Sequence, residues 1–379
     1  MVAPRRSIEH VHGQALRPPA QMGRPAVLGI GHSNPPTCIA QGRLPADYYF
    51  RVTNGEHLTD LKGQAHQDLA TCNPQRGTSS AAHPGLHRPQ VTIPRRPRGH
   101  RLRRPKAIAD WGRPATEITH LIFSTYSGAR APSGDRRLAS LLGLSPTVSR
   151  TMLNLHGCYG GGRSLQLAKE LAENNRGAHH SHRLLRAGRW LPGQTSLARR
   201  SSAMAPAPSI IGADPVSNVE RPLFEMAFAS QTTIPGTEDD ISMEINKGGM
   251  EYHISNKVPR LLGCNVERCL IDAFDALGVR AKWNDLFWAI HPGGRAILDH
   301  IEEVLGLDDG KLAASRHVLS EFGNMSGTTV IFVLDELRRR RVVKKEGEAL
   351  PEWGVMMAFG PGITIETLVL HAPDSLDGN

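Results

Sequence analysis

Residues 152–171 read MLNLHGCYGGGRSLQLAKEL, and this stretch decides the fold of the chain. An apolar segment that includes Met152 and Leu153 runs into a cysteine, Cys158, with glycines nearby on both sides. Strong helix formers follow, and they repeat apolar side chains at the spacing of one helical face, as at Leu165 and Ala168. The pattern predicts a strand, a tight turn and a helix, in that order.

The predicted turn places Cys158 at the N-terminus of a helix. Unpaired N–H groups and the helix dipole at such an end favour a thiolate over a thiol. The flanking glycines lack side chains that would block an incoming acyl group. A reactive cysteine and a buried structural cysteine beside a glycine-rich turn fit this stretch equally well, and residues further along the chain decide between them.

The composition is that of a chain large enough for two core-forming lobes, with 379 residues. Five cysteines are scattered without a CxxC pair, so we expect neither a disulfide framework nor a metal site. The first 21 residues lack the apolar core of a secretory signal. No apolar run approaches the ~20 residues that span a bilayer. These features predict a soluble, cytoplasmic protein without a membrane partner.

The net charge of +9 is concentrated in two segments. Residues 65–106 carry +8 and residues 178–206 carry +5, so the rest of the chain is mildly acidic. Arginine-rich tracts can bind phosphate by releasing counterions. Aromatic side chains that stack on bases are nearly absent, however, with only Trp190 in either segment. We therefore expect no nucleic-acid partner.

The well-patterned sequence predicts alternating strands and helices in both halves of the chain, as in a duplicated lobe. Strands are expected at residues 26–31, 119–124 and 286–290. Helices are expected from Thr53 or Asn54, and at residues 138–144, 266–277, 296–305, 318–324 and 329–341. A closing hairpin is expected over residues 354–370, turning at 360–362.

Two further residues are candidates to act with Cys158. His291 follows a predicted strand and precedes Pro292, so its ring is expected to project from a loop rather than into the core. Asn324 lies in a predicted helix, and an asparagine in a helix interior is unfavourable without a partner. A thiolate, an imidazole and an amide suffice for decarboxylative acyl transfer. The thiolate takes the acyl group and forms an ion pair with the imidazole, and imidazole and amide donate hydrogen bonds to the oxygen that becomes anionic. Taken separately, the two residues also fit a non-catalytic interpretation, in which His291 caps a turn and Asn324 is an ordinary helix residue.

Several blocks of sequence carry a resemblance to a known family. They are Gly157-Cys158 with the helix that follows, FWAIHPGG at 287–294, SEFGNMS at 320–326, a closing loop at 353–367, and YYFRVTNGEH at 48–57. These resemble blocks of the plant type III polyketide synthases, the chalcone and stilbene synthase enzymes. The resemblance covers about residues 26–64, 106–177 and 209–372.

The resemblance implies an α/β, thiolase-like αβαβα layered fold of two similar lobes, residues 22–208 and 209–376, in a homodimer. It implies iterative decarboxylative condensation of malonyl-CoA onto a CoA-linked starter, in polyketide or flavonoid biosynthesis. The CoA thioesters would be substrates, and no bound cofactor is expected. Cys158 would be acylated by the starter. His291 and Asn324 would form the oxyanion hole and stabilise the enolate left by loss of carbon dioxide.

The resemblance also implies a set of substrate-binding residues. Tyr252 matches a gatekeeper phenylalanine and adds a hydroxyl. Pocket serines, a residue lining the pantetheine tunnel and the closing loop are matched by Ser127, Ser326, Ala296, Gly360 and Pro361.

Three positions depart from the family pattern. Gln64 stands at the first position of a cationic CoA clamp. Met243 replaces a pocket glycine and would narrow the cavity. Ala131 matches a methionine that family members pass across the dimer interface.

Residues 65–105 and 178–208 do not resemble the family. Arg, Pro, His, Ser and Gly replace apolar periodicity there. The second segment stands where a strand should leave the Cys158 helix, and we expect it not to supply that strand. Our hypothesis is translation of a shifted frame or of intron sequence, which leaves open a catalytically dead or misfolded homologue. The alternative enzyme is a β-ketoacyl synthase III-like condensing enzyme, against which the closing loop and Glu56-His57 argue.

Overall fold

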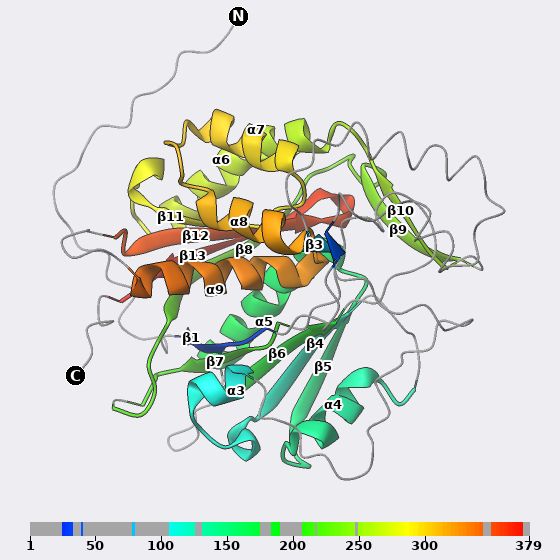
Figure 1. The fold of residues 1–379 in the computed structure, drawn as a ribbon, viewed down its shortest axis with the longest axis vertical. Helices are drawn as coiled ribbons and strands as arrows, with labels where there is room; N and C mark the ends of the chain where they lie inside the picture. The colour runs from blue at the N-terminus through cyan, green and yellow to red at the C-terminus, as the bar shows by residue number, and fades with distance from the viewer. Residues whose placement is uncertain are drawn as a thin grey trace, which may run out of the picture.

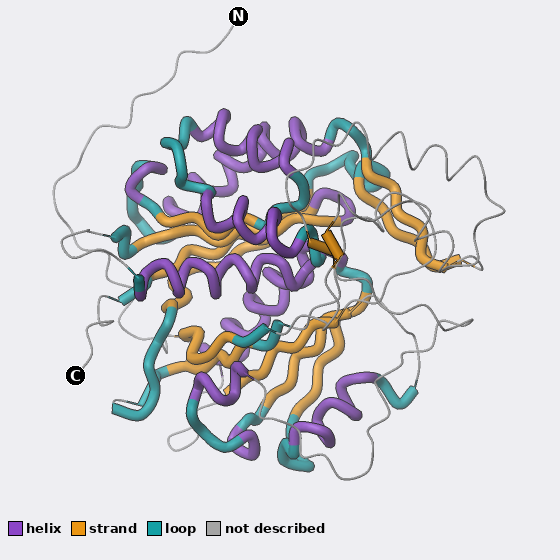
Figure 2. The backbone as a smooth tube through the Cα atoms, in the orientation of Figure 1, coloured by secondary structure: helices purple, strands orange, loops and turns teal. Residues whose placement is uncertain are grey.

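The computed structural model describes residues 25–32, 39–40, 78–79, 106–125, 131–174, 183–189, 207–216, 218–246, 249–343 and 350–373. It is a mixed α/β protein in which layers of helices alternate with layers of strands (Figures 1 and 2). Helices α6 and α7 lie on one outer side, and α3 and α4 lie on the other. Two groups of strands and a central layer of helices lie between them.

Nine of the described strands form one sheet, in the order β11-β12-β13-β8-β1-β7-β6-β4-β5. Its N-terminal half contains β1 (Pro25–Ile30), β4 (His120–Thr125), β5 (Ser149–Asn154), β6 (Arg183–Arg189) and β7 (Ser209–Ala213). Its C-terminal half contains β8 (Phe224–Thr233), β11 (Phe287–Ile290), β12 (Trp353–Gly360) and β13 (Thr364–His371). The halves meet where β1 pairs with β8, over two residue pairs, and Figure 1 shows them on opposite sides of the central helices.

Two smaller strand pairs lie outside this sheet. The hairpin of β9 (Ile241–Asn246) and β10 (Gly249–Ile254) projects from one end of the molecule (Figure 1). Strand β2 (Ile39–Ala40) pairs with β3 (Thr78–Ser79), so residues 65–105 contribute at least this short strand. The other residues of that segment lie outside the described part of the chain.

Helices α5 (Gly160–Asn174), α8 (Ala313–Phe322) and α9 (Thr329–Val342) form the central layer. Every residue of α9 from Thr329 to Asp335 is buried, as expected for a helix with apolar side chains on all sides. Helices α3 (Lys106–Trp111) and α4 (Gly134–Leu142) cover the N-terminal half of the sheet. Helices α6 (Val258–Ala276) and α7 (Arg295–Leu305) cover the C-terminal half. Short 3₁₀ turns are η2 (Ala115–Glu117), η3 (Gly157–Tyr159), η5 (Trp283–Asp285), η6 (Ser326–Thr328) and η7 (Pro361–Ile363).

The apolar runs of the C-terminal strands reflect burial on both faces. In β12, Val355 and Met357 pack into the core beneath α6 and α7, whereas Met356 and Ala358 pack into the core around α5 and α9. Side chains alternate between the two faces of a strand, so a strand covered by helices on both sides needs apolar residues throughout. This arrangement holds the sheet between two layers of helices.

Most of the predicted elements are confirmed. The strands at 26–31, 119–124 and 286–290, the helices at 296–305 and 329–341 and the closing hairpin match described elements within a few residues. The helices expected at 138–144 and 266–277 begin earlier, at Gly134 and Val258. The helix expected to reach Asn324 ends at Phe322, because Gly323 adopts a positive φ of 69°. The helix expected from Thr53 or Asn54 lies outside the described residues.

The expectation that residues 178–208 supply no strand is wrong. Strand β6 lies inside that segment and between β4 and β7. Leu184 is opposite His120 of the parallel neighbour β4 and opposite Ile211 of the antiparallel neighbour β7. Pairing uses backbone N–H and C=O groups that every residue except proline carries, so a segment without apolar periodicity can complete a sheet. A missing strand is therefore no reason to expect misfolding.

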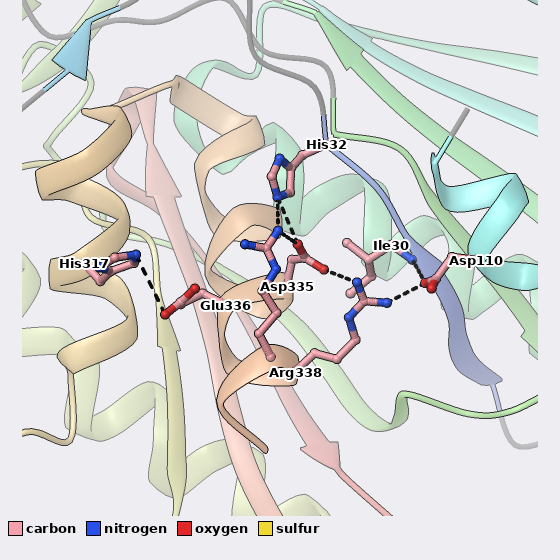
Figure 3. A network of polar contacts seen from close by, with 8 residues as sticks. Ile30, His32, Asp110, His317, Asp335, Glu336 and Arg338 are labelled. Atoms are coloured by element: carbon pink, nitrogen blue, oxygen red, sulfur yellow. Dashed lines mark hydrogen bonds and ion pairs between the residues drawn. The ribbon is translucent and has the colours of Figure 1, made fainter. Parts of the chain in front are cut away.

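A buried carboxylate, Asp335, joins the central helix α9 to the N-terminal elements (Figure 3). Its oxygens lie 2.9 Å from Nε2 of His32 and 2.5 Å from nitrogens of Arg338 and Arg339. Arg338 also binds Asp110 of α3, and that carboxylate accepts the backbone N–H of Ile30. Burial alone would raise the pKa of Asp335, but the hydrogen bond to His32 and the two guanidinium charges lower it overall. The network fixes α9 against β1 and α3.

The longest described helix is α6, with 19 residues. Neither it nor any other helix in the described ranges combines the length and apolar character needed to cross a membrane.

Replacing Asp335 by Asn tests this network. The change removes the buried carboxylate, 3% exposed, that Arg338 and Arg339 share, and it leaves Arg338 paired with Asp110 alone. We expect the free energy of unfolding at pH 7 to fall by about 3 kcal/mol, the usual cost of removing one partner of a buried ion pair. Because the folded-state pKa is lowered, this contribution is present above the ordinary pKa of 3.8 and is lost as the pH falls through the folded-state value.

Urea denaturation of both proteins at neutral and at acidic pH measures the difference. Glu336→Gln is the matched control, since its pair with Arg340 is more exposed and should contribute less than about 1 kcal/mol. Equal losses in the two variants would show that Asp335 has no special role.

Candidate active site

Cys158 lies in η3, between the end of β5 and the start of α5. The expected order of strand, turn and helix is therefore confirmed. Gly157 turns the chain with a φ of 56°, in the left-handed region that glycine adopts without strain. The closing loop packs on this turn. A Cβ atom on Gly157 would lie 2.7 Å from the Pro361 ring, and one on Gly360 would lie 3.1 Å from the Cys158 nitrogen. Gly360 and Pro361 thus border Cys158.

The glycines around Cys158 make room for protein atoms rather than for an acyl group, contrary to our expectation. A Cβ atom on Gly160 would meet Ser124, and one on Gly162 would meet Glu366, in each case at 2.7 Å. A Cβ atom on Gly161 would lie 2.0 Å from the carbonyl oxygen of Gly327 in η6. The backbones of α5 and η6 are therefore in direct contact, which brings the residues beside Gly327 to Cys158.

Asn324 and Ser326 reach the active-site thiol from the segment that contains Gly327. Both side chains hydrogen-bond to the Cys158 thiol. The Asn324 amide is held at both ends, because Nδ2 donates to the Gly293 carbonyl at 3.1 Å and Oδ1 accepts the Ser326 N–H at 2.8 Å. Ser326 is a buried non-glycine residue with a φ of 57°, a strained conformation that is typical of functional sites. Asn324 thus connects Cys158 to the loop that begins at His291.

Burial raises the pKa of the Cys158 thiol above its ordinary value of 9.0, and the hydrogen bonds from Ser326 and Asn324 offset only part of that effect. The expected thiolate is therefore not the resting form. Removing a charged group from water costs more free energy here than the helix terminus and two hydrogen bonds return. In the resting protein at neutral pH, the Cys158 side chain is therefore a thiol.

His291 follows β11, and its backbone N–H donates to the Met357 carbonyl at 2.8 Å. Its side chain is 0% exposed, so the expectation that the ring projects away from the core is wrong. The ring packs edge-on against Phe359, with centroids 5.6 Å apart. Burial lowers the pKa of His291 to about 3, so the imidazole is neutral at physiological pH. The expected imidazolium–thiolate pair is replaced by two neutral groups.

Neither ring nitrogen of His291 has a hydrogen-bond partner among the described residues. A neutral imidazole carries one N–H donor and one lone-pair acceptor. Buried polar atoms without partners cost free energy and are uncommon in folded proteins, so they indicate a role toward a ligand. The site thus offers a thiol, a neutral proton acceptor and a fixed amide donor, which are the groups needed for acyl transfer from a thioester.

The expected substrate-binding residues lie at several places. Tyr252 is half-buried on β10, directly opposite Met243 on β9, so these two side chains neighbour each other on the hairpin. Ala296 is exposed in the first turn of α7, and Ala131 is exposed before α4. Ser127 lies outside the described residues, as does Gln64.

Sequence reasoning missed Glu366 of β13. This carboxyl group is 0% exposed, and it accepts a hydrogen bond of 2.5 Å from Nε2 of Gln231. Its signal in the sequence was a single acidic residue in a run of otherwise uncharged strand residues, within the closing-loop block. In the described ranges, no cluster of His, Cys, Asp or Glu side chains is arranged to hold a metal ion.

Comparisons with known proteins identify the family to which this sequence is similar. The family described as chalcone and stilbene synthases matches twice, with its N-terminal domain at residues 91–185 and its C-terminal domain at residues 225–373. The N-terminal match extends into β6, beyond the residue at which the resemblance was expected to stop. Bisdemethoxycurcumin synthase of Oryza sativa subsp. japonica is 45% identical over 399 aligned positions, which cover 95% of this chain and 97% of that protein.

Gly161→Ala tests the contact between α5 and η6. The new methyl group would lie 2.0 Å from a backbone oxygen, so the helix and the turn must separate. Overpacking a core costs about 1–3 kcal/mol, and we expect a loss at the upper end of that range in urea denaturation. Gly134→Ala in α4 is the control, since its nearest atom would be at 3.5 Å. Equal stability of the two variants would contradict the proposed close contact.

Ser326→Ala tests the hydrogen bond to the thiol. Losing a bond that favours the thiolate should raise the pKa of Cys158 further and slow its alkylation by iodoacetamide about fivefold at mildly alkaline pH, equivalent to about 1 kcal/mol. Mass spectrometry of the labelled peptides measures the rate. Cys264, exposed on α6, serves as the internal control and should react equally in both proteins. Unchanged labelling of Cys158 would count against the bond.

Proposed function

The chain belongs to the chalcone and stilbene synthase family, and we propose that Cys158, His291 and Asn324 are its catalytic residues. It is a type III polyketide synthase, an acyltransferase homologous to a bisdemethoxycurcumin synthase. One observation carries the residue assignment. Asn324 contacts the Cys158 thiol and, through the Gly293 carbonyl, the loop that holds His291.

In the loading step, His291 accepts the Cys158 proton as the sulfur attacks the starter thioester. The acyl group moves to Cys158, and the departing CoA thiolate takes the proton back from the imidazolium. Both side chains start neutral because burial disfavours their charged forms. Charge therefore appears only while the bonds are changing, in a site with little water, where the fixed donors Ser326 and Asn324 stabilise it most.

In the extension step, the bond between the malonyl methylene carbon and its carboxylate breaks, and carbon dioxide leaves. The electron pair stays on the substrate as an enolate, whose oxygen takes hydrogen bonds from the His291 N–H and the Asn324 amide. The enolate carbon then attacks the acyl group on Cys158. A carbon–carbon bond forms, and the sulfur leaves as the thiolate, which can be acylated again.

We also propose the fold family, the lobe boundaries, the oligomeric state and the location of the protein. The alternation of helix and strand layers in Figure 1 supports a thiolase-like αβαβα fold, and we propose lobes at residues 22–208 and 209–376. We also propose a homodimer in the cytoplasm. The described cysteines Cys158, Cys264 and Cys269 are free, in keeping with a reducing compartment.

The product class is proposed from the relative. Because a protein of 45% identity is named bisdemethoxycurcumin synthase, we propose that this chain forms a related compound from an acyl-CoA starter. The flavonoid assignment rests on the sequence resemblance alone. Met243 lies beside Tyr252 on the hairpin, in place of the pocket glycine that the family resemblance implies. This supports a substrate cavity narrower than the one common in the family. Strand β6 weakens the alternative of a misfolded homologue, because it fills the place where no strand was expected.

Purified protein, radiolabelled malonyl-CoA and a panel of aromatic and fatty acyl-CoA starters test the proposal. We expect labelled polyketide from the wild type, none from Cys158→Ala, and a turnover lower by about 10²–10³-fold for Asn324→Ala, as when an oxyanion-hole donor is lost. Cys264→Ala, at an exposed cysteine, should keep the wild-type rate. Folded wild-type protein without malonyl turnover on any starter would instead support a catalytically dead homologue.

A further inference from the structure

The carboxyl group of Glu366 is buried directly beneath the first turn of the helix that follows Cys158. Glu366 lies on β13, opposite Gln231 of β8 and Ala358 of β12. A Cβ atom on Gly162 would lie 2.7 Å from Cβ of Glu366 and 3.1 Å from its Cγ. Gly162 is one helical turn after Cys158. The start of α5 therefore rests on this side chain.

The surroundings of Glu366 do not match a buried carboxylate. Its Oε1 accepts a hydrogen bond from the neutral Gln231 side chain, and its Oε2 has no partner among the described residues. The cation whose charge acts on Glu366 is Arg163, and its Nη1 lies 3.8 Å from Glu170, its ion-pair partner on α5. A buried charge without a paired cation costs several kcal/mol, so burial favours the protonated acid.

The pKa of Glu366 is also consistent with a protonated side chain. The pKa of Glu366 is raised to about 7, chiefly by burial and also by Glu170, although the Gln231 hydrogen bond and the Arg163 charge lower it in part. After burial, Glu366 is the next cause that raises the pKa of Tyr159, the residue beside Cys158, while Arg163 lowers it. The charge of Glu366 therefore acts on a side chain in the turn that contains Cys158.

The polypeptide chain also connects Glu366 to the closing loop that borders Cys158. Strand β13 begins just after the closing loop, in which Gly360 packs on the Cys158 nitrogen and Pro361 packs on Gly157. A shift of Glu366 relative to α5 would move this loop against the turn that contains Cys158. The side chain therefore controls the fit between two segments that border the nucleophile.

We propose that Glu366 is a positioning residue of the condensation reaction, an inference that rests on the proposed function. In its protonated form it seats the first turn of α5 on β13. Its ionisation draws Arg163 away from Glu170, displaces that turn and slows the chemistry at Cys158. Glu366 takes no part in bond making or breaking.

The pKa values of the other groups of the site are shifted away from neutral pH. The pKa of Cys158 is raised above 9.0 by burial, and that of His291 is lowered to about 3. His156, in the turn before Cys158, has its pKa lowered below 6.5, mainly by burial, with a partly opposing hydrogen bond to the Asn154 backbone and a further lowering by Arg163. An inflection of the rate near neutral pH therefore reports Glu366.

The test is the rate of labelled carbon dioxide release from malonyl-CoA, measured from about pH 5.5 to about pH 8.5. We expect the wild-type rate to fall about tenfold as the pH rises through 7, one pKa unit of coupling. Glu366→Gln mimics the protonated acid and should keep the acidic-side rate without the inflection. Glu225→Gln, a carboxyl on β8 that is paired with His371, should keep the wild-type profile.

A second measurement keeps this inference separate from the proposed function. Alkylation of Cys158 by iodoacetamide over the same pH range needs no turnover. We expect the wild type to depart near pH 7 from the curve of a single thiol, and Glu366→Gln to follow that curve. Identical alkylation profiles of the wild type and Glu366→Gln, or identical profiles of carbon dioxide release in active protein, overturn the role of Glu366. Absence of carbon dioxide release from folded wild-type protein overturns the proposed function, and the alkylation profiles still decide the role of Glu366.

Discussion

The backbone contact between Gly161 and Gly327 is the constraint on which the active site depends. Helix α5 and the turn η6 meet at the centre of the molecule, where an added Cβ atom would lie 2.0 Å from the opposing carbonyl oxygen. Asn324 and Ser326 belong to the segment leading into that turn, so the contact sets their position relative to the Cys158 thiol. The geometry of the three polar residues is thus a consequence of how closely two glycines pack.

Burial at this contact also determines the charge of the site. It raises the pKa of Cys158 and Glu366 and lowers that of His291, so each change favours the neutral form. A site of neutral groups is less costly to bury than an ion pair, and its fixed donors act most strongly when charge develops during reaction. In the reaction that we propose, the same removal of water that keeps Cys158 a thiol therefore makes stabilisation of the transition state effective.

Patterns within single elements were predictable because they depend on neighbouring residues. The buried strands β1 and β12, the helix α9 and the turn at Cys158 follow from apolar periodicity and from glycine positions. The strand β6 was not predictable in this way. Its place between β4 and β7 is secured by backbone hydrogen bonds to partners distant in the sequence, which leave little signal in side-chain periodicity.

The motifs that contain Cys158, His291 and Asn324 were sufficient to recognise the family and its reaction, and we propose that the chemistry uses those three side chains. Only the tertiary structure decided what state they are in and what lies beside them. It buries His291, replaces the expected ion pair by neutral groups, fills the space of the glycines with protein atoms and places Glu366 under α5. Desolvation and close packing depend on atoms brought together from distant parts of the chain, and no local stretch of sequence contains them.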